Sequence, residues 1–546
     1  MIASARWRLL LPAILACQLA GLLLSAPMRA QGTADIPLDD NAYVYIDALL
    51  ARGALRSLSS LERPYALAEL RKALEHDSEM IDDSRALRGF ARGLRRALRK
   101  YDAGSYEAAQ HRPLQDSTHT PLVRYNVGAD VYATGQTSTI REVMLDDETR
   151  AVYPGATLRV LGEAGPVSVV FRGVADGRLL RDPEFMIGDG PRDNARVDDG
   201  YIDARWPIAE VFVGREGRNW GPADGDGLLL GHYAYSYDHV YARLGPRAFH
   251  LQIIAARLND IVLGGDTVAE RYFTIHRLAT RWHSFELALS ESFIYGGPGQ
   301  GFDLRYLNPL NIFLLSQNNE SAVQNAPYTT NGNKAYAFEM AWRTHSLGNY
   351  AFEGYLDDYQ LHPTQSCQPI CSKPTSFGAT ATIDGFPFLG AQRLFASYSI
   401  MSNLSYRNDN PYEGYEQWGL GLGQGYTDYD EIRAGVDLAV LPEVPLKVYG
   451  AYRRQGQGNY RITEPPADSL PLTPTIFSGV VSYIGRVGVT GAVTGPWVEL
   501  SGDVGVNHAT NYQNVAGISR WSVAGTIKLS LSVARLFGGT IHVPGD

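Results

Sequence analysis

Apolar and polar residues alternate along most of the chain, from about Pro121 to the C-terminal end. In residues 123–133, Val, Tyr, Val, Ala, Val and Ala occupy every second position, with Arg, Asn, Gly, Asp and Tyr between them. The same period of two recurs in residues 336–343 and 498–507. Successive side chains of a β-strand point to opposite faces, so this pattern predicts strands with one apolar and one polar face.

We predict about 18 to 20 such strands, and several of them reach 11 to 13 residues. Strands of soluble sandwiches average about 5–6 residues, whereas a strand that crosses a membrane needs about 9–11. The predicted segments are 122–134, 157–163, 166–175, 208–215, 237–244, 247–258, 268–278, 282–294, 333–345, 347–359, 376–385, 391–402, 417–427, 430–440, 445–455, 475–485, 486–493, 496–507, 518–526 and 527–537. Their length favours membrane-spanning strands.

The links between the predicted strands are of two kinds. Short links, such as residues 244–246, 345–348 and 441–445, alternate with longer polar stretches that are rich in Tyr. Short turns at one rim and long loops at the other are typical of outer-membrane barrels. A propeller would need a repeated blade motif, and the sequence shows no internal repeat. We therefore predict an all-β transmembrane barrel of about 18 antiparallel strands over residues 111–546.

The segment before the barrel has the helical period of 3.6. Apolar residues at helical spacing predict helices near residues 43–50, 65–74 and 83–101, and Pro64 fits the first turn of the second helix. We assign residues 31–110 to a small periplasmic α-helical bundle. The last helix has a basic face, which either is solvated or contacts phosphate headgroups or an acidic partner; it consists of Arg92, Arg95, Arg96, Arg99 and Lys100.

Residues 1–30 have the features of a cleaved export signal. Arg6 and Arg8 precede an almost wholly apolar run, Leu9–Leu24, and small residues follow it. A membrane-anchoring helix is the alternative, although the run is short for a bilayer. Cys17 ends a string that resembles a lipoprotein cleavage box, so lipidation at Cys17 is a second alternative.

Composition narrows the functional classes further. Charged residues make up 20% of the chain and hydrophobic residues 45%, which excludes wholesale disorder. Tyr outnumbers Phe by 32 to 18, and Tyr suits a boundary between an apolar and an aqueous phase. Cleavage after Ala30 would remove three arginines and no acidic residue, changing the net charge from −9 to −12. We expect outer-membrane lipids as partners and no nucleic acid.

Cys367 and Cys371 lie in a loop-like segment between Pro363 and Pro374. A small loop-closing disulfide suits an exported protein, because the periplasm is oxidising. A metal site is the rival interpretation, but no second Cys pair stands nearby. We predict the disulfide.

The sequence predicts no enzyme, no cofactor and no metal site. It contains no HExxH, GxSxG, P-loop or CxxC motif. The spaced glycines of residues 419–425 are explained by a barrel strand, without a nucleotide. Residues 224–227, Asp-Gly-Asp-Gly, offer oxygen ligands for calcium, but an ordinary Gly-rich turn is the better interpretation.

Two segments combine aromatic residues with Asp, Asn and Arg in a way that suits saccharides. Sugars stack their C–H faces on aromatic rings and pair their hydroxyls with polar side chains. The same Trp and Tyr residues could instead form the interfacial girdle or fill the barrel lumen. The candidate binding residues are Trp220, Asp224, Tyr233, Tyr235 and Tyr237 in the first segment, and Arg407, Asp409 and Tyr412 in the second.

Three short strings add a family resemblance to this architecture: Arg63–Pro64–Tyr65, residues 214–222 (GREGRNWGP) and residues 307–313 (LNPLNIF). Together with the export signal and the long barrel, they resemble the Wzi-type capsule-assembly proteins of the outer membrane. The resemblance implies an 18-stranded barrel, a periplasmic helical bundle and binding of capsular or exopolysaccharide. The last predicted strand departs from the expected ending, because nine residues follow Phe537. No sugar-contacting residue can be transferred from the family.

Two functions remain open at this level. The first is a non-enzymatic surface lectin of the outer membrane that binds, organises or anchors polysaccharide, with the polysaccharide export machinery as a further partner. The second is an outer-membrane porin, in which the polar inner faces of the strands line a water-filled lumen. The two differ in whether the lumen is blocked. The oligomeric state cannot be predicted from this pattern.

Overall fold

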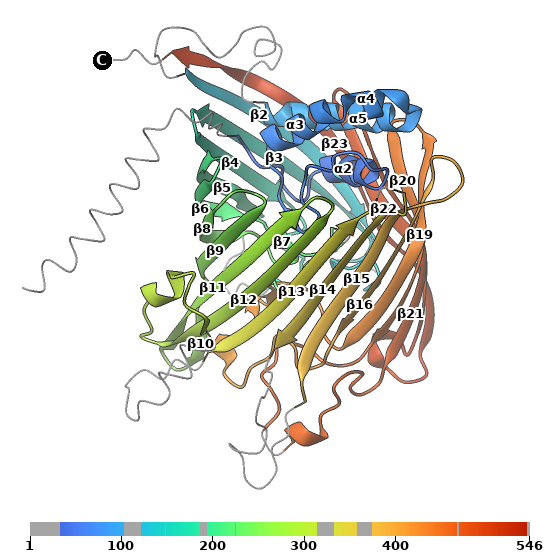
Figure 1. Ribbon diagram of the computed structural model, residues 1–546. Coiled ribbons are helices and arrows are strands. Elements are labelled where there is room, and N and C mark those ends of the chain that lie inside the picture. The colour runs from blue at the N-terminus through green and yellow to red at the C-terminus, as the bar shows by residue number, and fades with distance from the viewer. Residues whose placement is uncertain are drawn as a thin grey trace, which may run out of the picture.

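The computed structural model describes residues 33–102, 122–147, 149–185, 194–223, 225–313, 332–344, 346–357, 374–466 and 469–542. The predicted export signal, Cys17, Cys367 and Cys371 lie outside these residues. Most of the described chain forms one closed antiparallel barrel of 18 strands (Figure 1). The strands are β2 (Leu122–Gln136), β3 (Ala151–Ala164), β4 (Val167–Asp176), β5 (Ala195–Trp206), β6 (Ala209–Glu216), β8 (Tyr237–Leu244), β9 (Phe249–Arg257), β11 (Thr267–Trp282), β12 (Phe285–Pro298), β13 (Asn333–Arg343), β14 (Asn349–Asp357), β15 (Ser376–Pro387), β16 (Arg393–Met401), β19 (Tyr429–Leu441), β20 (Val444–Gln455), β21 (Ser482–Thr494), β22 (Val498–Thr510) and β23 (Ser519–His542).

The first and last barrel strands close the ring. β2 pairs antiparallel with β23, for example at Val131 and Leu531, and with β3 on its other side. β23 also pairs with β22, and each remaining strand pairs with its neighbours in the chain. A closed sheet leaves no strand edge with unpaired backbone groups, which is the condition for spanning a membrane with strands. The predicted fold class is confirmed.

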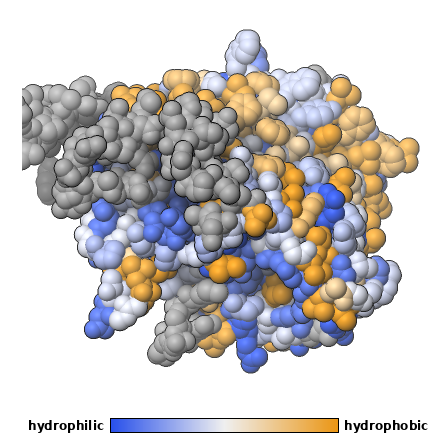
Figure 2. Space-filling view, turned by 90° about the horizontal axis from the view of Figure 1, so that it is seen from below, coloured by the Kyte–Doolittle hydropathy of each residue, from blue (hydrophilic) through white to orange (hydrophobic). Residues whose placement is uncertain are grey.

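The two faces of each strand differ as the alternating pattern predicts. On β13, Phe338 and Trp342 are 41% and 48% exposed, while Glu339 between them is 1% exposed. Large apolar residues of other strands are exposed on the same outer surface, including Val131, Leu158, Ile202, Val240, Ile432, Val487 and Leu529. In Figure 2, hydrophobic residues follow the right-hand edge of the molecule and hydrophilic ones lie nearer the middle. The barrel therefore has an apolar outer face and a polar interior.

The connections divide the barrel into two rims. Short turns join β3 to β4, β5 to β6, β8 to β9, β11 to β12, β13 to β14, β15 to β16, β19 to β20 and β21 to β22. We name the end that carries them the short-turn rim. The opposite end, the long-loop rim, carries the long connections, among them residues 137–150, 217–236 and 402–428. It also carries short elements: β10 (Ile261–Gly264), η2 (Leu304–Leu307), η3 (Pro411–Glu413), η4 (Leu470–Leu472) and η5 (Tyr512–Asn514).

The N-terminal helices lie across the short-turn rim (Figure 1). They are α2 (Ala42–Leu50), α3 (Leu67–His76), α4 (Ser78–Asp83), α5 (Arg85–Ala97) and η1 (Leu98–Tyr101). Gly89 of α5 lies so close to the β19–β20 turn that an added Cβ would stand 1.5 Å from the Pro442 carbonyl oxygen. Ion pairs also fix the helices: Arg52 with Asp437 at 2.9 Å, and Lys100 with Glu499 at 2.9 Å.

Several predicted elements differ from the structure. Residues 417–427 form no barrel strand but a loop with the short strands β17 (Glu416–Gln417) and β18 (Leu420–Gly421). β5 was missed, because its inner face carries Asp198 and Asp199 next to a bulge that interrupts the alternation. The four segments predicted from residue 475 to 493 and from 518 to 537 form only two strands, β21 and β23. The second helix begins at Leu67, so Pro64 precedes it.

Candidate functional site

The loop of residues 217–236 folds into the lumen. Its short strand β7 (Asn219–Trp220) pairs with β1 (Glu62–Arg63) of the N-terminal segment. Deeper in this first infolded loop, the backbone N–H groups of Leu228 and Leu229 donate to the Glu353 carboxylate of β14, at 2.9 and 3.2 Å. Glu353 is fully buried. A single inward carboxylate therefore holds the tip of this loop against the barrel wall.

A second infolded loop, residues 402–428, packs against the first. Tyr406 donates its hydroxyl to the Leu228 carbonyl, and Tyr415 donates to the Leu229 carbonyl at 2.8 Å. The two tyrosine rings stack with 5.1 Å between their centroids, and neither is exposed. Burial raises the pKa of both hydroxyls well above their usual value, so they stay neutral donors. The two loops thus share one hydrophobic core with the helices and inward strand residues.

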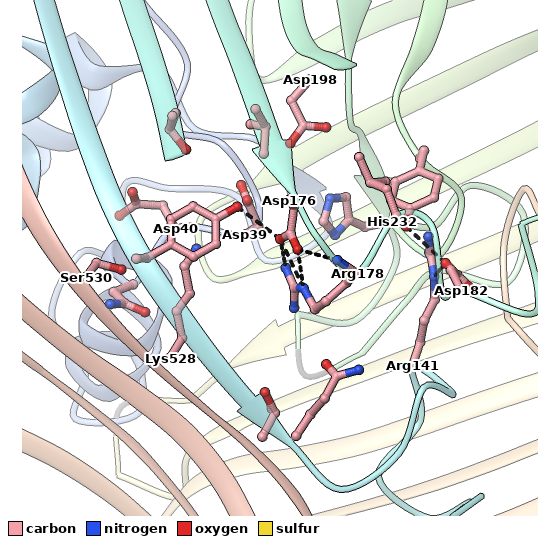
Figure 3. Close-up of a pocket in the computed structure, with 18 of the residues that line it drawn as sticks. Asp39, Asp40, Arg141, Asp176, Arg178, Asp182, Asp198, His232, Lys528 and Ser530 are labelled. Atoms are coloured by element: carbon pink, nitrogen blue, oxygen red, sulfur yellow. Dashed lines mark hydrogen bonds and ion pairs between the residues drawn. The ribbon is translucent and has the colours of Figure 1, made fainter. Parts of the chain in front are cut away.

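A cavity of about 460 Å³ remains between this core and one side of the barrel wall. Asp39 and Asp40 of the N-terminal segment bound it, together with β2, β3, β4 and β23 and the long-loop residues 137–145 and 178–182. We name it the luminal cavity. Figure 3 places Lys528 on one side of it, Asp176 near the centre, and Arg141 on the other side.

Ion pairs organise the charged lining of the luminal cavity. Arg178 pairs with Asp176 at 2.5 Å, and Arg141 pairs with Asp182 at 2.9 Å. Lys528 is different: its ammonium group lies 4.3 Å from the centre of the Tyr132 ring, and it makes no ion pair within the described part of the chain. Lys528 is therefore free to meet an incoming ligand, as is Arg181, which also lines the cavity and makes no ion pair within the same residues.

Asp39 ties the N-terminal segment to the cavity wall. Its carboxylate accepts from Arg172 of β4 at 2.9 Å, and Arg172 also pairs with Asp199 at 2.5 Å. Burial alone would raise the pKa of Asp39, but the charges of Arg172 and Lys528 outweigh it and hold that pKa well below its usual range. Asp39 therefore stays ionised, and it carries a fixed negative charge next to the cavity.

Two further titratable groups of the cavity belong to the first infolded loop. The backbone N–H of His232 donates to Asp226 at 2.9 Å. Burial raises the pKa of the Asp226 carboxyl and lowers the pKa of the His232 imidazole, so it favours the neutral form of each. Asp226 and His232 therefore differ from the aspartates and arginines elsewhere in the cavity lining, which form ion pairs.

Tyrosines of the first infolded loop complete the lining. Tyr235 donates its hydroxyl to Asp182 at 2.9 Å, and the guanidinium groups of Arg141 and Arg196 lie 4.0 and 3.7 Å from its ring centre. Tyr233 donates to Glu184 at 2.7 Å. The cavity therefore offers N–H donors, carboxylate acceptors and aromatic carbon within one space, and this combination suits a ligand with many hydroxyl groups.

The other residues predicted in the first segment lie elsewhere. Trp220 is 2% exposed and lines a smaller cavity of about 80 Å³, with the Arg277 guanidinium 5.0 Å from its ring. Tyr237 begins β8 and packs against the hydrophobic core inside the barrel. Asp224 lies outside the described residues. Of this group, the structure brings only Tyr233 and Tyr235 together in the luminal cavity.

The residues predicted in the second segment do not line the luminal cavity. Arg407 is buried and donates to the carbonyl oxygens of Ile462 and Thr463, at 3.1 and 2.5 Å, so it joins two long loops. Asp409 is exposed and Tyr412 is half-buried on the same infolded loop. Sequence reasoning missed Arg141 and Arg178, which no motif marks. Lys528 had a signal, since it occupies the polar face of a predicted strand.

Two searches for other features gave negative results within the described ranges. No group of three or more His, Cys, Asp or Glu side chains there is arranged to hold a metal ion. Among the helices of the same residues, none combines the length and the apolar character that crossing a membrane requires.

A closed barrel with an apolar outer face and an interior crossed by loops defines an outer-membrane β-barrel protein. The chain matches the family described as "Capsule assembly protein Wzi" over residues 118–454, which is more than half of its length. It therefore belongs to the Wzi capsule assembly family, as the resemblance predicted. No curated protein sequence is similar enough to this chain to count as a match.

Solved structures of outer-membrane proteins are similar to this chain, and the first of those named here shares its fold. Wzi from Escherichia coli, described as an outer-membrane protein involved in group 1 capsule assembly and a carbohydrate-binding β-barrel, is 14% identical; the match covers 92% of this chain and 99% of that one, with a TM-score of 0.57. OccD3 (OpdP) of Pseudomonas aeruginosa is 10% identical, over 80% and 98% of the two chains, with a TM-score of 0.43. OprD of the same organism is 9% identical, over 77% and 96%, with a TM-score of 0.38.

Proposed function

We propose that this chain binds and organises capsular or exopolysaccharide at the cell surface as a non-enzymatic, lectin-like barrel. The observation that carries the proposal is the luminal cavity, which is lined by tyrosines, ion-paired arginines and carboxylates above a core that crosses the lumen. Membership of the Wzi family supports it, as does the carbohydrate binding described for the Escherichia coli protein.

The chemistry of the cavity suits recognition of a polysaccharide. Sugar hydroxyls can accept from the guanidinium groups of Arg141 and Arg178 and can donate to the carboxylates of Asp176 and Asp182. Lys528 adds a cation, so an acidic sugar in the polymer would find a partner there. These contacts require no change in the protein, because ion pairs already fix the side chains.

The same ion pairs favour binding over hydrolysis. A glycosidase needs one carboxylic acid that can give up a proton and a second carboxylate across the sugar bond. Asp176, Asp182 and Asp198 each form an ion pair with an arginine, so their carboxyl oxygens already have donors. They are therefore suited to accept from sugar hydroxyl groups, and none of the three stands alone as a glycosidase acid would.

The porin alternative conflicts with the two infolded loops. Residues 225–231 and 402–428 bond to each other across the lumen, and the N-terminal helices lie across the rim on the same axis. A water-filled channel needs an unobstructed path between the rims. We infer that the intact chain is not a general porin.

The orientation follows from this function. We propose that residues 1–30 are removed on export, that the helices of residues 31–110 face the periplasm, and that the long-loop rim faces outward. The helices would then be available to the polysaccharide export machinery, and the outer face of the barrel would contact outer-membrane lipids. The disulfide between Cys367 and Cys371 remains a prediction of the sequence.

The proposal is tested by deleting the gene and measuring surface-attached and shed polysaccharide. We expect the polymer to be made but lost to the medium, and we expect the intact gene to restore attachment. Restoration by Lys528→Met should be much weaker, because it removes a cation of the luminal cavity that makes no ion pair within the described residues, while keeping the apolar stem. Lys72→Met makes the same change on the exposed surface of α3 and should restore attachment fully. Unchanged attachment in the deletion strain would contradict the proposal.

A further inference from the structure

A second cavity lies at the long-loop rim. It has a volume of about 310 Å³ and is lined by residues of four loops, at 140–146, 426–427, 456–461 and 512–514, and by the adjoining ends of β20, β21, β22 and β23. We name it the rim pocket. The rim pocket is a separate space from the luminal cavity.

We propose that the rim pocket is a second saccharide subsite, which takes a neutral, hydroxyl-bearing sugar residue of the same polymer. The inference rests on the proposed function, because it takes the ligand of the luminal cavity to be a polysaccharide. It adds a site that the sequence did not predict.

Two buried side-chain oxygen atoms of pocket residues, one on Gln455 and one on Thr427, lack a hydrogen-bond partner among the described residues. Gln455 is 7% exposed; its amide nitrogen donates to the carbonyls of Thr427 and Gly456, at 2.9 and 3.3 Å, but its Oε1 accepts from no group of the described chain. The hydroxyl of Thr427, 1% exposed, is also unpaired. An unpaired buried oxygen is unfavourable. A ligand hydroxyl that donates to Gln455 would remove this cost.

Apolar residues supply another part of the pocket lining. Met144, Ile484 and Ala509 are buried there in one hydrophobic cluster, and Leu145 and Tyr512 pack against it. A pyranose ring has an apolar C–H face and an edge of hydroxyl groups, so it matches a pocket that combines apolar carbon with unpaired acceptors. An acyl chain would leave the acceptors unpaired.

Both of the described arginines that line the rim pocket are already engaged. Arg520 lies 4.8 Å from the centre of the Tyr512 ring. Arg461 donates to the Gly419 carbonyl at 2.6 Å, lies 4.7 Å from the centre of the Tyr460 ring, and pairs with Glu184 at 3.4 Å. The unpaired atom of Gln455 is an acceptor, which would repel a phosphate or carboxylate oxygen. A neutral sugar therefore fits the rim pocket better than an anion does.

The rim pocket and the luminal cavity are neighbours. Ile140 and Leu145 line both, so the loop between β2 and β3 forms the partition. Tyr426 lines the rim pocket, and its ring lies 6.0 Å from that of Tyr233 in the luminal cavity. A polymer held in the luminal cavity can therefore extend over this loop and place another sugar in the rim pocket.

The test measures binding of fragments of different length. The probe is the polysaccharide that the deletion strain sheds, cut into size-fractionated oligosaccharides, and the protein is the full chain in detergent. The variants Thr427→Val and Gln455→Met keep side-chain size but remove the unpaired oxygens. Gln455→Met also removes the two amide donations to Thr427 and Gly456, so Thr427→Val is the decisive variant. We expect each to weaken binding of long fragments about two- to tenfold, as the loss of one hydrogen bond predicts. Binding of the shortest fragments, which occupy only the luminal cavity, should not change.

Lys528→Met separates failure of this inference from failure of the proposed function. If it weakens binding of all fragments while Thr427→Val and Gln455→Met weaken none, the rim pocket is no subsite. If the unaltered chain binds no fragment, both proposals are overturned. A measurement without variants guards against misfolding: long fragments should slow amide hydrogen exchange in residues 456–461, and short fragments should not. Equal exchange with both would contradict the rim subsite.

Discussion

Single buried residues, rather than the loops themselves, determine how the lumen is filled. Glu353 is the clearest case, because its carboxylate accepts the N–H groups of both Leu228 and Leu229. Gly221 lets this carboxylate come close: with φ of +134°, it lies where an added Cβ would stand 2.4 Å from Glu353 Oε2. The position of the Glu353 carboxylate on β14 therefore requires a residue without a side chain at position 221 of the loop.

Replacing Glu353 should therefore release the first infolded loop. Glu353→Ala leaves two buried N–H groups without an acceptor, and each costs about 1–3 kcal/mol. We expect faster amide hydrogen exchange at residues 228 and 229 and new protease cleavage in the loop. Glu353→Gln keeps one acceptor oxygen and should have a smaller effect. Unchanged exchange in the alanine variant would mean that other contacts hold the loop.

At the same scale, the candidate site was only partly predictable. Tyr233 and Tyr235 could be found because aromatic and polar residues interleave within a few positions. Arg407 has the same local signature, yet its donors bond to the backbone of residues 462 and 463, so its role is structural. Lys528 reaches the cavity because β23 closes the ring against β2. Residues that meet only when the barrel closes are far apart in the sequence, so no short motif marks them.

At the scale of elements, the docking of α5 depends on ionised groups. Glu443 in the β19–β20 turn pairs with Arg92 and Arg96, at 2.5 and 2.6 Å. Burial tends to raise the pKa of Glu443, but hydrogen bonds and charges from the two arginines outweigh it and lower that pKa below its ordinary value of 4.5. Burial tends to lower the pKa of Lys100, but Asp40 and Glu499 outweigh it and raise that pKa above 10.5.

These directions predict the pH range in which the helices stay docked. A lowered carboxyl pKa gives stability that is present above pH 4.5 and is lost as the pH falls through the folded-state value. A raised lysine pKa gives stability that is present below pH 10.5 and is lost as the pH rises through its folded-state value. A spin label on α5 and another on the β21–β22 turn should keep a constant distance between these limits. The distance should broaden at more acidic pH.

The variant pair Arg92→Ala and Arg96→Ala provides the control. This double variant removes both arginine partners of Glu443. The distance between the two spin labels should therefore broaden at a higher pH than in the unaltered chain, or should already be broad at neutral pH. An identical acid transition in this variant and in the unaltered chain would show that Glu443 does not control docking.

The elements themselves were largely predictable, for a physical reason. Strands such as β13 alternate large apolar and charged residues, because one side belongs to the apolar outer face and the other to the polar interior. The segments that were predicted wrongly do not have one apolar outer face and one polar inner face. β5 carries consecutive acidic residues at a bulge, and residues 417–427 alternate leucine with glycine because they fold inward, where Gly423 approaches the Leu228 carbonyl closely.

At the scale of the whole molecule, two barriers lie in series along the barrel axis. The helices cover the short-turn rim, and the infolded loops bond to each other inside the lumen. Removing either barrier leaves the other. Removing both barriers should therefore raise the conductance by much more than the sum of the increases from removing each barrier alone.

We expect the intact chain in planar bilayers to give no steady conductance. Deletion of residues 42–101 alone, or replacement of both infolded-loop segments (225–231 and 402–428) by flexible glycine–serine segments alone, should give at most brief openings. The two changes combined should give sustained channels, because only then is the axis unobstructed. Heat-induced mobility shifts on gels should verify that every variant still forms a barrel. Steady conductance of the intact chain would contradict the plugged lumen and would favour the porin, whereas silence of the combined variant would show that still another segment blocks the path.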